Sequence, residues 1–160
     1  MKKFFLAALG AVVIILYSCG KDGNGTTSCT GVEPVTEQDS ILAFVAKNGY
    51  SATKLSNGMY YQIVNQGTGA APKITNTVRA NYIGKLFDGT VFDADSTVSG
   101  ISFALSGVIQ GWQIGVPLIQ SGGTIRLFVP SKYAYGCAGS GTSILPNKPL
   151  FFEIKLLAVY

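Results

Sequence analysis

The pair Asp88-Gly89 constrains the fold of this chain more than any other feature of its sequence. It follows residues 77–86, where apolar and polar side chains alternate, and it precedes a second extended run that begins at Val91. Alternation with a period of two is typical of a strand with one buried face. An Asp-Gly pair between two such runs favours a tight hairpin. The sequence therefore predicts an antiparallel sheet.

Further short runs of strand character lie on both sides of this hairpin and are separated by glycine-rich turns. They are residues 59–64, 101–105, 124–129 and 150–159, of which the last is apolar on both faces. A short helix is expected around Trp112. Antiparallel strands with few helices indicate an α+β domain. We expect a five- to six-stranded sheet wrapped around that short helix, over residues 50–160.

A helical extension is expected before this domain, at residues 36–49. Thr36 is a suitable N-cap, the segment from Ile41 to Val45 carries an apolar stripe, and Asn48-Gly49 is a stop signal. The stripe has two interpretations: it packs on the main domain, or it forms a dimer contact.

The first residues resemble an export signal. Two lysines precede an apolar run that ends in Ser18-Cys19, a charged-then-apolar layout typical of signal peptides. A small residue before cysteine resembles a bacterial lipobox, which implies a lipoprotein signal peptide at residues 1–18 and lipidation at Cys19. An ordinary signal peptide and an uncleaved anchor are the alternatives. Gly20 resembles the signal for sorting to the outer membrane, and residues 19–35 form a flexible tether.

Composition excludes several kinds of chemistry. The chain has no histidine, which removes imidazole bases and most zinc sites. Its 12 basic and 8 acidic residues include no polybasic run, so nucleic-acid binding is not expected. Asp93 and Asp95 flank a turn but lack the dense oxygen ligands of a calcium loop. No metal and no cofactor are predicted.

Cys29 and Cys137 would share an oxidising compartment after export, where disulfides form. Because Cys29 lies in the flexible tether, we expect no intramolecular bond between them.

The residues Val108-Ile109-Gln110-Gly111-Trp112 surround the only tryptophan of the chain. A short helix that lays one large indole across a sheet would give an apolar pocket with an aromatic floor. The alternative is that Trp112 belongs to the ordinary core, where tryptophan is usually mostly buried.

Eight motifs occur in a fixed order from about residue 58 to the C-terminus. They are VRANYIG (78–84), LFDGTVFD (86–93), ISFAL (101–105), VIQGW (108–112), RLFVPS (126–131), YAYG (133–136), ILP (144–146) and LFFEI (150–154). Their order and spacing resemble the FKBP-type peptidyl-prolyl cis-trans isomerases. The resemblance implies a sheet of five or six strands around a short helix, and a pocket that binds proline.

The same resemblance assigns roles to individual residues. Trp112 would form the pocket floor, and Phe103 would pack behind the wall. The walls would be Tyr82, Phe92, Ile101, Val108, Ile109 and Phe152, with Asp93 at the rim and Ile144 on a flap over the pocket. Ile109 N–H and the Tyr135 hydroxyl would bind ligand carbonyls, and Tyr82, Asp93 and Tyr135 would be the catalytic residues.

We therefore predict a lipid-anchored isomerase of the bacterial cell envelope, on the outer membrane and facing the periplasm or the surface. Its substrates would be proline-containing segments of exported proteins, and macrolide inhibitors of the family would bind the pocket. Desolvating and twisting an X-Pro amide needs no nucleophile or cofactor. The alternatives are a chaperone or scaffold that binds prolyl peptides with little turnover, and a surface lipoprotein that has lost its pocket.

Overall fold

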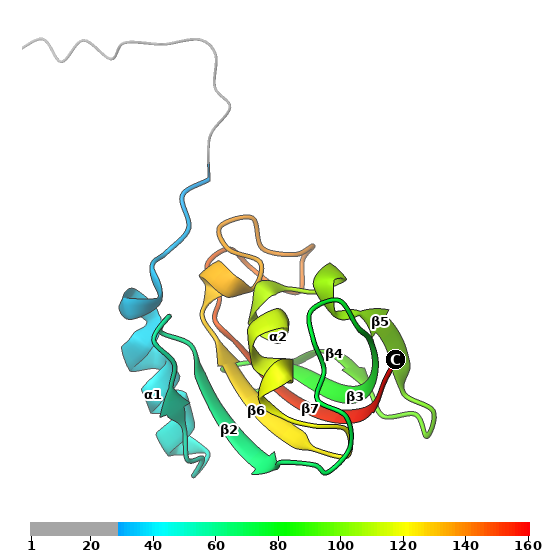
Figure 1. Ribbon diagram of the computed structural model, residues 1–160. Coiled ribbons are helices and arrows are strands. Elements are labelled where there is room, and N and C mark those ends of the chain that lie inside the picture. Colours follow the sequence, from blue (N-terminus) through cyan, green and yellow to red (C-terminus); the bar gives the residue numbers. More distant parts are fainter. Residues whose placement is uncertain (1–28) are drawn as a thin grey trace, which may run out of the picture.

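One antiparallel sheet organises the domain in the computed structural model, which describes residues 29–160 (Figure 1). Its strands are β1 (Thr53–Lys54), β2 (Tyr60–Asn65), β3 (Thr77–Leu86), β4 (Val91–Asp95), β5 (Ile101–Ala104), β6 (Thr124–Val129) and β7 (Leu150–Val159). The strand order is β1-β2-β6-β7-β3-β4, and β5 pairs with β3. The predicted fold class is confirmed. The sheet has seven strands, more than expected, because the two-residue β1 pairs with the edge of β2.

The long strand β3 joins the two sides of the sheet. One of its edges pairs with β7 along its length. Its other edge pairs first with β5, opposite residues 77–80, and then with β4, opposite residues 82–85. This arrangement follows from the Asp88-Gly89 hairpin, which returns β4 along the second half of β3 only. The strands β4 and β5 therefore lie end to end on one edge of β3.

The helix α2 (Gln110–Gly115) packs on one face of the sheet, against β6 (Figure 1). Two glycines permit this close approach. A Cβ atom on Gly111 would overlap the side chain of Val129, and one on Gly115 would overlap Leu127. The main core lies between α2 and the sheet and includes Leu105, Val116, Ile119, Ile125, Leu127, Phe152, Ile154 and Leu156.

The helix α1 (Gln38–Lys47) covers a part of the opposite face (Figure 1). A second apolar cluster joins it to the sheet through Ile41, Phe44, Val45, Tyr60, Phe128 and Phe151. The apolar stripe therefore packs on the main domain. This second cluster explains why β7 is apolar on both faces: Phe151 belongs to one cluster and its neighbour Phe152 to the other.

The helix begins later than predicted. A 3-10 turn, Pro34–Glu37, precedes α1, and Thr36 makes no capping hydrogen bond with its side chain. Glu37 is buried instead, and its Oε2 accepts a hydrogen bond of 2.7 Å from the Ser131 N–H. A buried carboxylate needs such a partner, and this contact fixes the entry of the chain into α1.

The prediction for the two cysteines was wrong. Cys29 and Cys137 form a disulfide, with Cα atoms 5.7 Å apart and a sequence separation of 108. The sequence indicated that Cys29 belongs to a free tether. In the structure the segment from Cys29 onward runs along the domain, so the two thiols meet.

Within residues 29–160, no helix is both long and apolar enough to cross a bilayer. The predicted signal peptide, the lipidation site Cys19 and the first part of the predicted tether lie outside the described residues.

Candidate functional site

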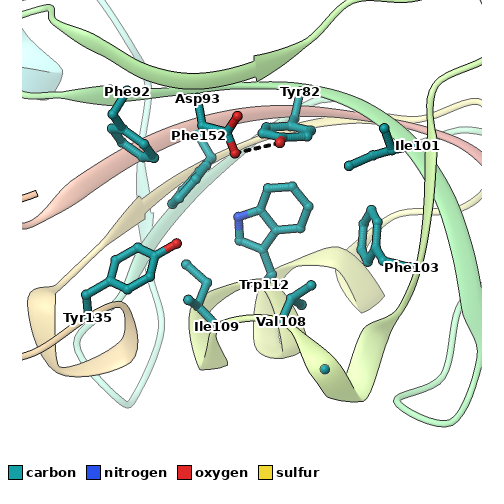
Figure 2. Close-up of a pocket in the computed structure, with 11 residues that line it drawn as sticks. Tyr82, Phe92, Asp93, Ile101, Phe103, Val108, Ile109, Trp112, Tyr135 and Phe152 are labelled. Atoms are coloured by element: carbon teal, nitrogen blue, oxygen red, sulfur yellow. Dashed lines mark hydrogen bonds between the residues drawn. The ribbon is translucent and has the colours of Figure 1, made fainter. Parts of the chain in front are cut away.

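A cavity of about 370 Å³ opens between α2 and the strands β3, β4, β5 and β7. Figure 2 shows side chains from all of these elements directed into it. The lining residues are Tyr82, Phe92, Asp93, Ile101, Phe103, Gly107, Val108, Ile109, Trp112, Tyr135 and Phe152. The structure thus brings together in one pocket nine of the ten residues expected to bind substrate, Ile144 being the exception.

Trp112 forms the centre of the pocket. Its indole is 5% exposed and is surrounded by three aromatic rings, with centroids 5.1 Å away for Tyr82 and 5.4 Å away for Phe103 and Phe152. These rings stand edge-on or tilted to the indole, which is the favourable geometry for aromatic pairs. They hold the indole in place while it still lines the cavity.

The indole N–H has no hydrogen-bond acceptor among residues 29–160. The ring of Phe152 lies perpendicular to the indole, at 90°, and Figure 2 shows the indole nitrogen on the side that faces Phe152. The buried donor thus faces aromatic carbon rather than a polar acceptor.

Among residues 29–160, Asp93 is the only charged side chain that lines this pocket. Its Oδ2 accepts a hydrogen bond of 2.6 Å from the Tyr82 hydroxyl (Figure 2). Burial raises the pKa of Tyr82, and the hydrogen bond to Asp93 and its negative charge raise that pKa further. The phenol of Tyr82 is therefore neutral in ordinary buffers and acts as a hydrogen-bond donor.

Two further polar groups face the cavity. Ile109 lines it at the N-cap of α2, and its backbone N–H donates to no acceptor within the described part of the chain. Tyr135 lies across the pocket from Tyr82, with its hydroxyl directed inward (Figure 2). Burial, and to a lesser degree Asp93, raise the pKa of Tyr135. Both groups are therefore donors available to a carbonyl oxygen in the pocket.

Sequence reasoning missed two residues at this site. Gly107 lines the pocket. Gln113, on α2, donates from Nε2 to the carbonyl oxygens of Ser106 and Val108 at 3.2 and 2.7 Å. These bonds fix the loop that carries Gly107 and Val108. Nothing in the local pattern marks Gln113, because its role depends on how the preceding loop folds back. Phe103 also lines the cavity itself rather than packing behind a wall.

Ile144 does not line the pocket. Its side chain is 4% exposed and belongs to the main core. Two backbone hydrogen bonds between Ser140 and Ile144, of 2.8 and 3.1 Å, close the loop on itself, and the apolar side chain is buried beneath it. Its neighbour Leu145 is exposed to 58%. The expected role of Ile144 as a flap over the pocket is therefore corrected.

Groups of three or more metal-ligating side chains do not occur within residues 29–160. The pocket instead combines an apolar floor, aromatic walls and a few donors at its rim. A curled antiparallel sheet with a short helix defines the class of this domain, and its pocket is suited to a small apolar group that carries hydrogen-bond acceptors.

The comparisons with known proteins name this class. The family model described as FKBP-type peptidyl-prolyl cis-trans isomerase matches residues 69–157. The chain belongs to this family.

Individual relatives and solved structures agree with this family assignment. FkpA of Escherichia coli (strain K12), an FKBP-type peptidyl-prolyl cis-trans isomerase, is 47% identical over 105 residues, which are 65% of this chain and 38% of that protein. "Outer membrane protein MIP" of Legionella longbeachae is 42% identical over 106 residues, 66% of this chain and 46% of that protein. A peptidyl-prolyl cis-trans isomerase structure from Pseudomonas syringae pv. tomato superposes with a TM-score of 0.67 at 32% identity, covering 81% of this chain and 98% of that one.

The chain spans about half the length, or less, of the curated relatives that it matches.

Proposed function

We propose that this domain is a peptidyl-prolyl cis-trans isomerase that assists the folding of exported proteins. The observation that carries the proposal is the apolar cavity of about 370 Å³ built on Trp112, in which Asp93 is the only charged lining residue from the described part of the chain. This volume is near the lower end of ligand pockets, which suits a proline ring with its flanking amides.

The chemistry requires no bond to be made or broken. Rotation about an X-Pro amide is slow because it interrupts resonance, at a cost of about 18–20 kcal/mol. The planar amide is more dipolar than the twisted one, so removing both from water penalises the ground state more. An acceleration of about a million-fold requires roughly 8 kcal/mol of preferential stabilisation of the transition state. Aromatic walls that exclude water are suited to supply part of it.

Polar groups at the rim supply the remaining stabilisation of the transition state. In this proposal Ile109 N–H and the Tyr135 hydroxyl donate to substrate carbonyls and hold the amide in the twisted geometry. The Tyr82 hydroxyl, held at 2.6 Å from Asp93 Oδ2, orients the wall that contacts the proline. Donors that fit the twisted form better than the planar form lower the barrier. We assign catalytic roles to Tyr82, Asp93 and Tyr135.

The remaining lining residues are proposed to contact the substrate through apolar surface. They are Phe92, Ile101, Phe103, Val108, Trp112 and Phe152. Macrolide inhibitors of this family present a ring of similar size and are proposed to occupy the same space.

We further propose that the protein is a lipoprotein of the cell envelope. Cys19 would carry the lipid, and the domain would act on exported chains at the outer membrane. The pattern of residues 1–20 supports this location, and one relative bears the name outer membrane protein. Mass spectrometry of the chain isolated from membranes tests it: a diacylglyceryl group on an N-terminal Cys19 is expected, and an unmodified N-terminus contradicts the proposal.

A protease-coupled assay tests the enzymatic proposal. A tetrapeptide with leucine before proline is cleaved only in the trans form, so the slow phase reports isomerisation. We expect the full-length chain to accelerate this phase in proportion to its concentration. Measurable peptide binding with no acceleration would favour a prolyl-peptide chaperone instead.

A further inference from the structure

Three links join the N-terminal strap, residues 29–37, to the segment that carries Tyr135. The Cys29–Cys137 disulfide is the first. Lys132 Nζ forms an ion pair of 2.8 Å with Glu33. Glu37 Oε2 accepts the Ser131 N–H at 2.7 Å in a buried position. The strap is thus attached at three points to residues 131–137. None of these three links involves the apolar face of α1.

The attached segment needs such support. Residues 134–149 contain no regular helix or strand. Gly136, Gly139 and Gly141 all have positive φ, at 54°, 67° and 53°, and glycine-rich backbone loses the most conformational entropy on ordering. Long loops with few buried contacts open readily. Tyr135 lies at the start of this loop and lines the pocket.

The links reach Tyr135 from both sides in sequence. Cys137 is two residues beyond it. On the other side, the Ser131 whose N–H is held by Glu37 accepts, through its carbonyl oxygen, the Gly136 N–H at 2.8 Å. The Tyr135 carbonyl in turn accepts the Gly139 N–H at 3.1 Å. The backbone of Tyr135 is therefore enclosed between the covalent link and the buried carboxylate.

We propose that the strap positions Tyr135 in the pocket, and that Cys29, Cys137 and Glu37 are positioning residues for substrate binding. This inference rests on the proposed function. A disulfide that closes a long loop restricts the conformations open to the chain. A donor fixed in its bound geometry costs less entropy when the substrate binds. Releasing the strap therefore weakens substrate binding while the walls around Trp112 stay intact.

The test compares the wild-type full-length chain with the variant Cys29→Ser/Cys137→Ser, with Tyr135 present and in a Tyr135→Ala background. With Tyr135 present, we expect the KM for the leucine-proline tetrapeptide to rise about three- to tenfold, with a smaller change in kcat. In the Tyr135→Ala background, removal of the disulfide should leave KM unchanged. Hydrogen exchange at the Gly136 and Gly139 amides should become faster when the disulfide is removed.

Variants at Glu37 and Ile41 provide matched controls. Glu37→Ala should raise KM, whereas Glu37→Gln, which still accepts the Ser131 N–H, should restore it. Ile41→Val trims the buried face of α1 without touching the strap, so it should lower the melting temperature and leave KM unchanged.

Two results would overturn the inference. One is a melting temperature that falls on loss of the disulfide with KM and amide exchange unaltered. The other is a KM that rises equally in the Tyr135→Ala background. If the wild-type chain with its disulfide intact accelerates nothing, the proposed function fails. The strap is then judged by amide exchange and by the calorimetric affinity for the same peptide.

Discussion

The hydroxyl of Tyr82 and the carboxylate of Asp93 are joined by a hydrogen bond of 2.6 Å across the β3–β4 pair. The strand register places Asp93 opposite Gly84, so Tyr82 and Asp93 are diagonal neighbours across two strands. The ring of Tyr82 also meets Trp112 edge-on, with centroids 5.1 Å apart. One bond at the pocket rim therefore fixes an aromatic wall that touches the floor.

The first prediction concerns this pair. Asp93→Ala removes a charged acceptor, and hydrogen bonds to charged groups contribute about 1.5–3 kcal/mol, so kcat/KM should fall roughly tenfold or more. Tyr82→Phe should cause a similar loss. Because both act through one bond, the double variant should be no worse than the poorer single variant. Losses that simply add in the tetrapeptide assay would show that the two residues act independently.

The second prediction concerns alkaline pH. The raised pKa of Tyr82 means that the unfolded chain ionises this phenol at a lower pH than the folded chain. Below about pH 10 both states are protonated and the group does not alter the pH dependence of stability. Above that pH the folded chain binds more protons, so the free energy of unfolding falls as pH rises.

Urea unfolding of the parent and of Tyr82→Phe at several alkaline pH values checks this. The variant lacks the titrating group, so its stability should decline less as the pH rises above about 10. An equally steep decline in the variant would assign the effect to other groups, such as Tyr135, whose pKa is also raised.

The third prediction uses two glycines at the same pocket. A Cβ atom on Gly84 would lie 2.6 Å from the ring of Phe92 and 3.0 Å from that of Phe152, so Gly84→Ala should push these walls inward. A Cβ atom on Gly107 meets nothing within 4 Å. Calorimetry with the tetrapeptide should show weaker binding by Gly84→Ala and little change for Gly107→Ala. Equal affinities would mean that Phe92 does not shape the binding space.

The regular parts of the fold were predictable because their signals are local. Three strands were predicted correctly, at residues 77–86, 124–129 and 150–159. Each shows either alternating or continuous apolar residues, and each is flanked by residues typical of turns. The edge strand β1 was not predicted, because a strand of two residues shows no periodicity in the sequence. The predicted N-cap at Thr36 was also wrong, because Glu37 accepts a hydrogen bond from Ser131, which lies 94 residues further along the chain.

The pocket could be foreseen only through the order of the motifs. An indole near a glycine is equally typical of a core, and no local signal separates Ile109, which lines the pocket, from Ile144, which is buried. The prediction for the two cysteines was wrong for the same reason: Cys29 and Cys137 meet only because residues 29–37 run along the domain. The sequence pattern does not indicate where irregular segments lie relative to residues that are distant in sequence.

The fourth prediction concerns the helix α1. The ring of Phe44 stacks on Phe87 at 4.4 Å and 11°, and it also contacts Phe128 and Phe151. Phe44→Ala should therefore lower the free energy of unfolding by about 3–5 kcal/mol. The cluster lies on the other face of the sheet from the pocket, so peptide affinity of the folded fraction should stay unchanged. Val35→Ala, at a side chain exposed to 73%, is the control and should affect neither quantity.

The most direct test is NMR exchange spectroscopy of a proline peptide with the full-length chain, while a macrolide ligand of the family is titrated and Trp112 fluorescence is followed. If prolyl amides are twisted in the hollow above this indole, catalysed exchange should decline as the fluorescence change saturates. It should end at the uncatalysed rate, with a time constant of tens to hundreds of seconds. Exchange that continues at its full rate after the fluorescence has saturated would place the reaction elsewhere and contradict the account.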